Sequence, residues 1–355
     1  MTTTAKALLA AASLTLLASP ILARQQAGPG ARLAPECRAE IAQLCANARG
    51  QPGAMRACLR EKASELSDGC RAELRQRVEE RARASGTAGR APMRAPAPQQ
   101  TLAYGNDPLQ ALDLWVPQGA KKAPLVLFVH GGGWQRGSKS NALGHALPGH
   151  MLEQGYAFAS IDYRLLPKAK VEDQAADVAA ALAFVLARAE SLGIDRSRVV
   201  ITGHSAGAHL VALVGTDERY LKAAGLSFAD IDGVMPNDGA AYDVARQISA
   251  AGPRMRETYL AAFGSDPARQ KALSPLTHAA APNAPAFLLL HVQRPDAVAQ
   301  TKALAEALQR AGTRAEVAGF PGEGLKGHME INRRLGEADY PATAKVDAWL
   351  KALFG

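Results

Sequence analysis

The five residues Gly203–Gly207, with the sequence GHSAG, constrain the fold more than any other part of this chain. They follow the short β-branched run Val199–Thr202 and precede the helical run His209–Val214. A strand that turns so sharply into a helix leaves little room for side chains, and glycine at both ends of the motif removes the clash. The turn therefore presents the Ser205 hydroxyl at the carboxyl end of a strand.

Strand-like and helical runs alternate on both sides of this motif. The candidate strands are 112–116, 125–129, 156–161, 199–202, 286–292 and 315–320, and the candidate helices are 175–192, 209–214 and 300–311. This order predicts an α/β fold with a mostly parallel sheet and helices on both faces. In such sheets binding sites form at the carboxyl ends of the strands, where Ser205 lies.

A second glycine-rich segment, His130–Trp134 (HGGGW), follows the strand-like run 125–129 and precedes Ser205. Acyl transfer builds negative charge on a carbonyl oxygen, and backbone N–H groups aimed at that oxygen stabilise it. Glycines permit such a close approach of the backbone. We predict Gly132, Gly133 and Ala206 as the donors of an oxyanion hole. Trp134 is predicted to line the substrate pocket, with core packing as an equal alternative.

A serine nucleophile needs a histidine base, and four histidines follow Ser205 in the chain. In folds with this serine turn, the chain order is serine, carboxylate and then histidine. His328 comes just after the last strand-like run, and we predict it as the base. His209, His278 and His291 lack this position and are expected to be packed or surface residues.

The acid that orients the histidine is predicted to be Asp296. It follows the strand-like run 286–292 and precedes the predicted base by 32 residues. Rival candidates are Asp238 and Asp243, which follow an earlier apolar stretch, and Glu323 near the histidine.

These motifs together resemble the bifunctional feruloyl and acetyl xylan esterases and related carboxylesterases over residues 101–355. The likeness rests on residues 130–134, 163–167, 203–207, 274–276 and 328–332. The resemblance implies an α/β-hydrolase fold, a metal-free and cofactor-free ester hydrolase, and a catalytic triad of Ser205, Asp296 and His328. The chain departs from the pattern where many relatives have a His-Gly turn before the acid, because His291 is here followed by Val292.

The four cysteines all lie between Cys37 and Cys70, separated by seven, twelve and eleven residues, without a metal-binding spacing. Helices are predicted over 35–46, 54–66 and 68–83, with a turn at 50–53 and Ser67 as a helix cap. Cys45 and Cys58 are placed symmetrically about the turn, so we pair them and leave Cys37 for Cys70, among three possible connectivities. The segment 35–83 resembles the cysteine-rich repeat of the Golgi apparatus protein 1 family, which brings no catalytic residues; docking and stabilisation are both open roles.

Residues 1–23 are predicted to be a signal peptide, since a basic start precedes an apolar run too short to span a bilayer comfortably. A secreted or periplasmic protein would hold its cysteines as disulfides. Residues 84–100 have linker composition and separate the cysteine-rich module from a hydrolase domain over 101–355. Residues 24–100 carry 14 Lys and Arg against 8 Asp and Glu, whereas residues 101–355 carry 26 against 25. The basic excess therefore lies in the N-terminal segment, where envelope contact is one interpretation and a solvated surface is the other.

The sequence predicts a secreted serine carboxylesterase that acts on small-molecule or polysaccharide-linked esters. Neither a nucleic-acid partner nor a metal is expected. An arylformamidase-like amide hydrolase and a non-catalytic binding protein on the same scaffold are the alternatives.

Overall fold

A computed structural model describes residues 33–46, 55, 58–59, 62–84, 95–140, 143–280 and 282–355. The chain divides into two compact units, Met1–Ala91 and Pro92–Gly355. The division falls within the predicted linker of residues 84–100. The predicted signal peptide of residues 1–23 lies outside the described residues.

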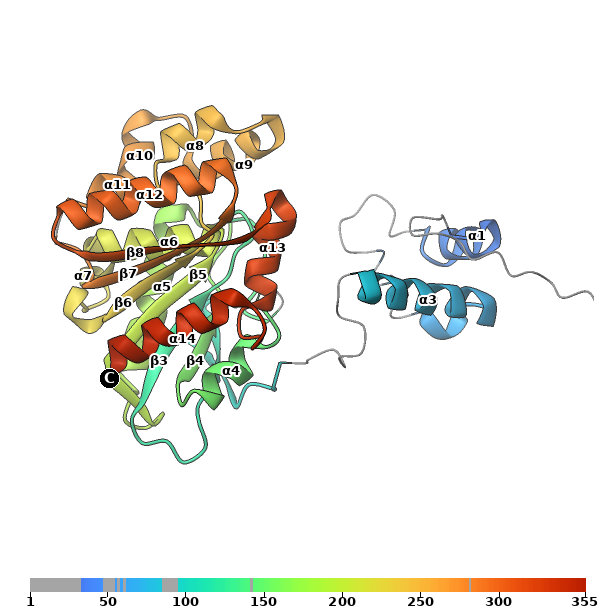
Figure 1. Ribbon diagram of the computed structural model, residues 1–355, viewed down its shortest axis with the longest axis horizontal. Helices are drawn as coiled ribbons and strands as arrows, with labels where there is room; N and C mark the ends of the chain where they lie inside the picture. Colours follow the sequence, from blue (N-terminus) through green and yellow to red (C-terminus); the bar gives the residue numbers. More distant parts are fainter. Residues whose placement is uncertain are drawn as a thin grey trace, which may run out of the picture. The chain divides into compact units, whose positions relative to one another are not determined.

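The larger unit is built on a sheet of eight strands in the order β1-β2-β4-β3-β5-β6-β7-β8 (Figure 1). The strands are β1 (Gln100–Ala103), β2 (Ala111–Trp115), β3 (Ala123–Val129), β4 (Ala157–Ile161), β5 (Ile194–His204), β6 (Gly233–Asn237), β7 (Ala286–Gln293) and β8 (Arg314–Glu323). Only the pairs β1–β2 and β2–β4 are antiparallel among the described pairs. The predicted α/β-hydrolase fold with a mostly parallel sheet is confirmed.

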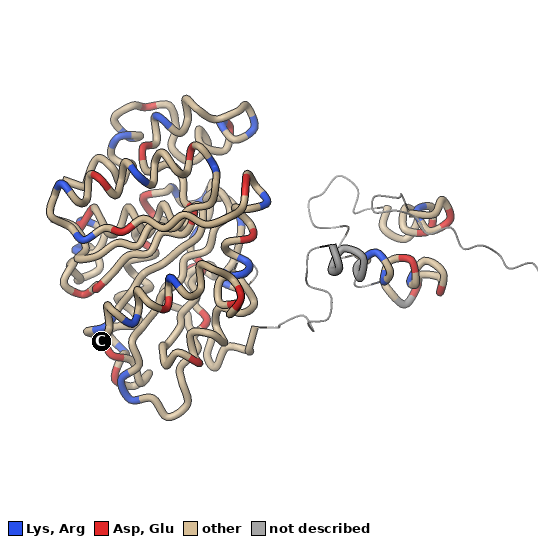
Figure 2. The backbone as a smooth tube through the Cα atoms, viewed as in Figure 1, with Lys and Arg blue, Asp and Glu red and all other residues tan. Residues whose placement is uncertain are grey.

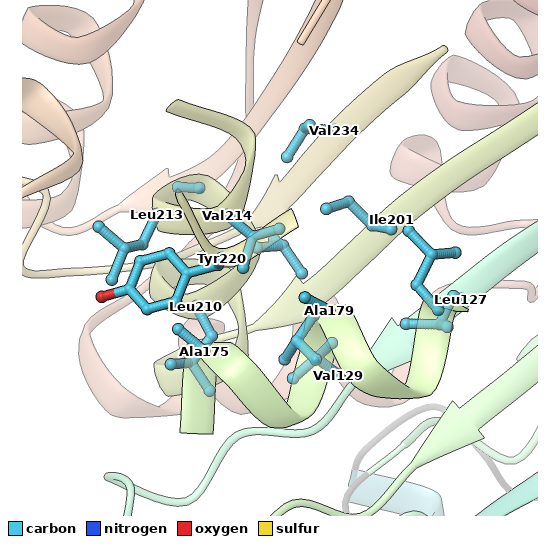
Figure 3. Packing of buried hydrophobic residues seen from close by; sticks show 14 of the residues in the cluster. Leu127, Val129, Ala175, Ala179, Ile201, Leu210, Leu213, Val214, Tyr220 and Val234 are labelled. Atoms are coloured by element: carbon cyan, nitrogen blue, oxygen red, sulfur yellow. The ribbon is translucent and has the colours of Figure 1, made fainter. Parts of the chain in front are cut away.

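Alternate residues of the central strands enter two separate cores. On β3, Leu125 and Leu127 face the larger core, whereas Val126 and Phe128 face the smaller one. Because both faces of a parallel sheet are covered, its strands read as continuous apolar runs rather than as alternating ones. Figure 3 shows part of the larger core, to which Leu127 and Ile201 of the sheet and Ala179 and Leu210 of the covering helices belong.

Helices cover both faces of the sheet (Figure 1). The larger core is closed mainly by α5 (Val171–Leu186), α6 (Ala206–Thr216), α7 (Arg219–Ala223) and α12 (Pro295–Arg310), and the smaller core by α4 (Leu147–Glu153), α13 (Gly324–Arg334) and α14 (Pro341–Phe354). Four further helices, α8 (Val244–Ala250), α9 (Pro253–Phe263), α10 (Pro267–Ala272) and α11 (Pro275–His278), lie between β6 and β7 in the chain. Charges of both signs are interspersed over this unit (Figure 2), as its nearly balanced composition implies.

The smaller unit contains α1 (Pro35–Leu44), the 3-10 turn η2 (Ala63–Glu65) and α3 (Asp68–Ala84). Disulfides join Cys37 to Cys70 and Cys45 to Cys58, so the predicted pairing is confirmed. The Ser67 hydroxyl accepts a hydrogen bond from the backbone N–H of Cys70, as expected of a helix cap. A core this small buries little apolar surface, and disulfides are the usual compensation.

Within the described parts of the chain, no helix combines the length and the apolar character that crossing a bilayer requires.

Candidate active site

The serine turn joins β5 to α6 at the carboxyl edge of the sheet. Ser205 has φ 58° and ψ −116°, which an L-residue rarely adopts. A Cβ at Gly207 would collide with the backbone oxygens of Val129 and His130, and one at Gly203 would collide with Gly207 itself. Glycine at both positions therefore lets the turn close against β3, and the serine side chain stays partly exposed.

His328 brings its imidazole to this serine from another part of the chain. It lies in the second turn of α13, directly after β8, and its Nε2 is 3.0 Å from Ser205 Oγ. The corner between β8 and α13 is tight, because a Cβ at Gly327 would meet the backbone of Gly322. The structure therefore joins Ser205 and His328 as the sequence predicted, with His328 on a helix.

The carboxylate that contacts this histidine is Asp238, and the prediction of Asp296 is wrong in this respect. Asp238 Oδ2 lies 2.6 Å from His328 Nδ1, whose N–H donates to it. Asp238 follows β6 with φ 45°, and its backbone N–H donates to the carbonyl oxygen of Leu290 on β7. Asp238 was one of the rival candidates, and it occupies the end of the strand next to the predicted one.

Asp296 points elsewhere because a helix begins immediately after β7. Pro295 is the first residue of α12 and Asp296 the second, so the chain has already turned away from the sheet edge. The Asp296 carboxylate accepts a hydrogen bond from Gln247 Nε2 at 3.1 Å, on α8. The other rivals are also engaged elsewhere: Asp243 caps α8 through the N–H of Arg246, and Glu323 is exposed.

The environment of Asp238 favours its charged form. Burial is complete and raises the pKa of Asp238, but the hydrogen bond from His328 and the positive charge of Arg294 outweigh burial and leave the pKa below its ordinary value. Its Oδ1 accepts from the backbone N–H of Val292 at 3.1 Å. Arg294 Nε lies 3.3 Å from Oδ2. The acid is thus held ionised beside the histidine.

His204, the residue before the serine, contacts both the backbone and the ring of His328. Its Nε2–H donates to the backbone carbonyl of His328 at 2.8 Å, and the two rings lie 4.4 Å apart between centroids. Burial and the neighbouring His328 lower the pKa of His204 to about 3, so it is neutral at neutral pH. No role for this residue follows from the sequence, where its place inside the serine motif is the only local signal.

The glycine loop lies beside the serine turn. Gly132 and Gly133 have φ values of 137° and 63°, and a side chain at Gly132 would collide with the backbone of Arg136. A Cβ at Gly131 would come 3.0 Å from Ser205 Cβ, so the loop passes close to the serine. Ala206 is the first residue of α6, where backbone N–H groups have no partner within the helix. The role of Gly132, Gly133 and Ala206 as oxyanion donors stays a prediction.

Trp134 belongs to the core rather than to an open pocket wall. Its ring is 2% exposed and packs edge-on against His209, Tyr259 and Phe263. Its backbone carbonyl accepts from Gln174 Nε2 at 2.9 Å. The structure therefore favours the core-packing alternative, in which the ring anchors the end of the glycine loop.

The other histidines after the serine are bonded away from it. Nε2–H of His209 donates to Leu273 O at 2.9 Å, that of His278 donates to Ala272 O at 2.8 Å, and His291 is buried beside Gly319. Within the described ranges, no group of three or more His, Cys, Asp and Glu side chains is arranged to hold a metal ion.

Exposed apolar side chains lie on α13, which carries His328, and on α9. Leu325 and Met329, 75% and 51% exposed, lie on α13 on either side of His328 in the sequence. Met255, 48% exposed, lies on α9, one turn before Thr258, whose Cγ2 is 3.1 Å from where a Gly133 Cβ would be. These are the three large hydrophobic residues that are exposed among those the structure describes. Leu325 and Met329 are four residues apart on α13 and share one face of that helix, and exposed apolar patches can mark ligand-binding surfaces.

A comparison with protein families matches residues 112–308, 197 of the 355 residues, to the model of the family BD-FAE. Among curated proteins, the chain is similar to Esterase LipC of Mycobacterium tuberculosis, with 38% identity over 119 residues, 33% of this chain and 29% of that protein. It is also similar to isoprenylcysteine alpha-carbonyl methylesterase ICME of Arabidopsis thaliana, with 33% identity over 135 residues, 37% of this chain and 31% of that protein. The matches span less than a third of either relative.

Among solved structures, the fold is similar to esterase B from Lactobacillus rhamnosis, with a TM-score of 0.59 and 22% identity, covering 79% of this chain and 92% of that one. At this identity the likeness concerns the fold. It extends over nearly the whole of the compared chain.

Proposed function

The chain belongs to the BD-FAE family, an α/β-hydrolase esterase family, and we propose that it hydrolyses carboxylic esters with Ser205 as its nucleophile. The observation that carries the proposal is the hydrogen-bonded series in which His328 contacts Ser205 on one side and Asp238 on the other. A nucleophile, a base within hydrogen-bond reach and a buried orienting carboxylate are the parts that acyl transfer through a serine requires.

In the proposed reaction, Ser205 Oγ attacks the ester carbonyl carbon while His328 Nε2 accepts the hydroxyl proton. Asp238 holds the imidazole in the tautomer that leaves Nε2 free and stabilises the imidazolium that forms. The carbonyl oxygen becomes an oxyanion that the N–H groups of Gly132, Gly133 and Ala206 stabilise. Losing one such donor typically costs about 3–4 kcal/mol of barrier.

The tetrahedral intermediate then collapses. The bond to the leaving oxygen breaks, and His328 gives its proton to the departing alcohol, which leaves an acyl group on Ser205. A water molecule repeats the sequence: His328 takes its proton, the hydroxide attacks the acyl carbon, and the carboxylic acid leaves as Ser205 regains a proton. Each step conserves atoms and uses the same base.

The apolar side chains beside the site bear on the kind of ester. We propose that an apolar acyl or alcohol group of the substrate binds against α13, since Leu325 and Met329, which precede and follow His328 in the sequence, are exposed. An amide-type substrate, as in arylformamidases, would use the same three side chains. A binding protein without catalysis is less well supported, because nothing in its task would need His328 between a serine and a buried carboxylate.

We also propose that the protein is exported and that its cysteine-rich unit contacts an anionic envelope surface. The support is the leader-like composition of residues 1–23, the two disulfides and the basic excess of residues 24–100. N-terminal sequencing of the protein from an extracytoplasmic fraction would test the export. A mature N-terminus near residue 24 is the expected result, and a retained Met1 in the cytoplasm would contradict it.

The direct test of esterase activity uses the full protein and a Ser205→Ala variant with p-nitrophenyl acetate and a fluorophosphonate. We expect hydrolysis and one covalent adduct on Ser205 in the first, and neither in the variant. Hydrolysis that persists in the variant would place the nucleophile elsewhere. No hydrolysis and no adduct in either protein would overturn the catalytic proposal in favour of binding.

A further inference from the structure

Arg294 lies between β7 and α12 and is the residue immediately before the helix. Its side chain is only 15% exposed, which is unusual for arginine unless the charge has a partner. Its Nε lies 3.3 Å from Asp238 Oδ2, and its Nη2 donates to the carbonyl oxygen of Gly239 at 3.3 Å. The guanidinium therefore contacts both Asp238 and the residue that follows it.

One carboxylate oxygen of Asp238 contacts both His328 and Arg294. Oδ2 of Asp238 accepts from His328 Nδ1 at 2.6 Å and faces Arg294 Nε, while Oδ1 accepts from the N–H of Val292. The acid comes from the end of β6, whereas two of its three partners come from the end of β7. This arrangement explains how an acid with a positive φ at the end of one strand keeps a fixed direction.

We propose that Arg294 is a positioning residue for the reaction: it holds Asp238 from the neighbouring strand and, because it shares Oδ2 with His328, offsets part of the negative charge that Asp238 presents to the histidine. The inference rests on the proposed function, because it concerns the base of that reaction. The role proposed for Arg294 depends on its positive charge, which a role in packing alone would not require.

The direction in which the pH profile should move when Arg294 is replaced follows from the charges. A protonated His328 would be stabilised by the full negative charge of Asp238 and is destabilised by the nearby guanidinium. Removing that positive charge stabilises the imidazolium. The protonated and inactive form then persists to higher pH, so the acidic limb of the kcat/KM profile moves upward.

Five further titratable groups lie near this cluster. They are His204 on β5, Tyr242 beyond β6, Tyr259 on α9, Asp296 on α12 and Tyr340 ahead of α14. Burial lowers the pKa of His204 to about 3 and raises the pKa of Tyr259 and of Tyr340 to about 12. Burial also raises the pKa of Tyr242 above its usual value. These four groups therefore keep one charge state across the range in which the acidic limb falls.

The experiment measures kcat/KM against pH for the full protein and for Arg294→Met, Arg294→Gln and Arg294→Lys. The Gln variant keeps a neutral N–H donor at the position along the side chain where Arg294 has Nε, so it serves if the Met variant does not fold. Arg310→Met is the matched control, since Arg310 lies on the same helix with its side chain 71% exposed. We expect the two neutral variants to move the acidic limb upward by roughly 0.5–1 pH unit, with the Lys variant and the control close to the parent.

Acidic limbs of the neutral variants that coincide with that of the parent would overturn the inference. So would a Lys variant that shifts as far as the neutral ones, because the effect would then come from shape rather than charge. Failure of the proposed function looks different: the parent protein itself would neither hydrolyse esters nor form the Ser205 adduct.

Discussion

Three buried histidines surround the serine turn, and their burial decides their charge. Burial lowers the pKa of His130 to about 4 and that of His209 to about 4, and burial together with His328 lowers the pKa of His204 to about 3. Each is neutral in the folded protein at neutral pH. A neutral His204 can approach His328 without repelling its protonated form, which the proposed reaction requires transiently.

This burial makes the stability of the larger unit depend on pH. In the unfolded chain the histidines bind protons below about pH 6.5, whereas in the folded chain they do so only near the lowered values. The unfolded state thus takes up protons first, and the free energy of unfolding falls as the pH falls through this window, by on the order of 2 kcal/mol per histidine between about pH 7 and pH 5. Urea titrations at the two pH values measure the difference.

A matched pair of variants separates this effect from general acid sensitivity. His209→Gln should reduce the difference between the two pH values, whereas His145→Gln, at an exposed position, should leave it unchanged. An equal pH dependence in both variants would mean that buried histidines do not cause it.

At the scale of the elements, α13 combines two tasks. It carries His328 into the site and presents Leu325 and Met329 to solvent beside it. We therefore expect the double change Leu325→Ser and Met329→Gln to lower kcat/KM for p-nitrophenyl octanoate about tenfold and to leave that for the acetate nearly unchanged, since only the longer chain reaches these side chains. The acetate serves as the internal control. An unaltered ratio of the two substrates would show that α13 does not contact the acyl chain.

The sequence predicted those elements whose signal is local. Six of the eight strands were predicted, five of them to within three residues at each end, while β5 begins five residues before its predicted start. Most were found because strands covered on both faces of a sheet are continuous apolar runs. Two strands were missed: β1 is a mostly exposed four-residue edge strand, and β6 is five residues long with Pro236 inside. Ser205 and His328 were predicted because a strained turn and chain order mark them.

The acid could not be read from the sequence in the same way. Asp238 and Asp296 both follow strands that are neighbours in the sheet, so chain order admits either. Which aspartate contacts His328 depends on two local features. Pro295 begins α12 two residues after the end of β7, and the positive φ of Asp238 turns its side chain toward His328. Trp134 was ambiguous for a similar reason: whether a ring after the glycine loop faces a pocket or the core depends on α9, far along the chain.

At the scale of the whole molecule, the two units rely on different sources of stability. All four cysteines belong to the smaller unit, and the larger one contains none. A disulfide closing a loop of this size typically contributes about 3 kcal/mol. Reduction with dithiothreitol should therefore lower the melting temperature of the smaller unit and leave ester hydrolysis unchanged. Loss of hydrolysis on reduction would mean that the cysteine-rich unit is needed for an intact site.

Asp238, and not Asp296, completes the proposed active site with Ser205 and His328. Asp238→Asn and Asp296→Asn, compared by kcat on p-nitrophenyl acetate, test it most directly. Replacing the orienting carboxylate of such a triad by an amide typically lowers kcat by roughly 10⁴-fold, because the histidine is held in the wrong tautomer. We expect a loss of about that size in Asp238→Asn and less than about threefold in Asp296→Asn. The reverse pattern, with Asp296→Asn crippled and Asp238→Asn active, would contradict the account.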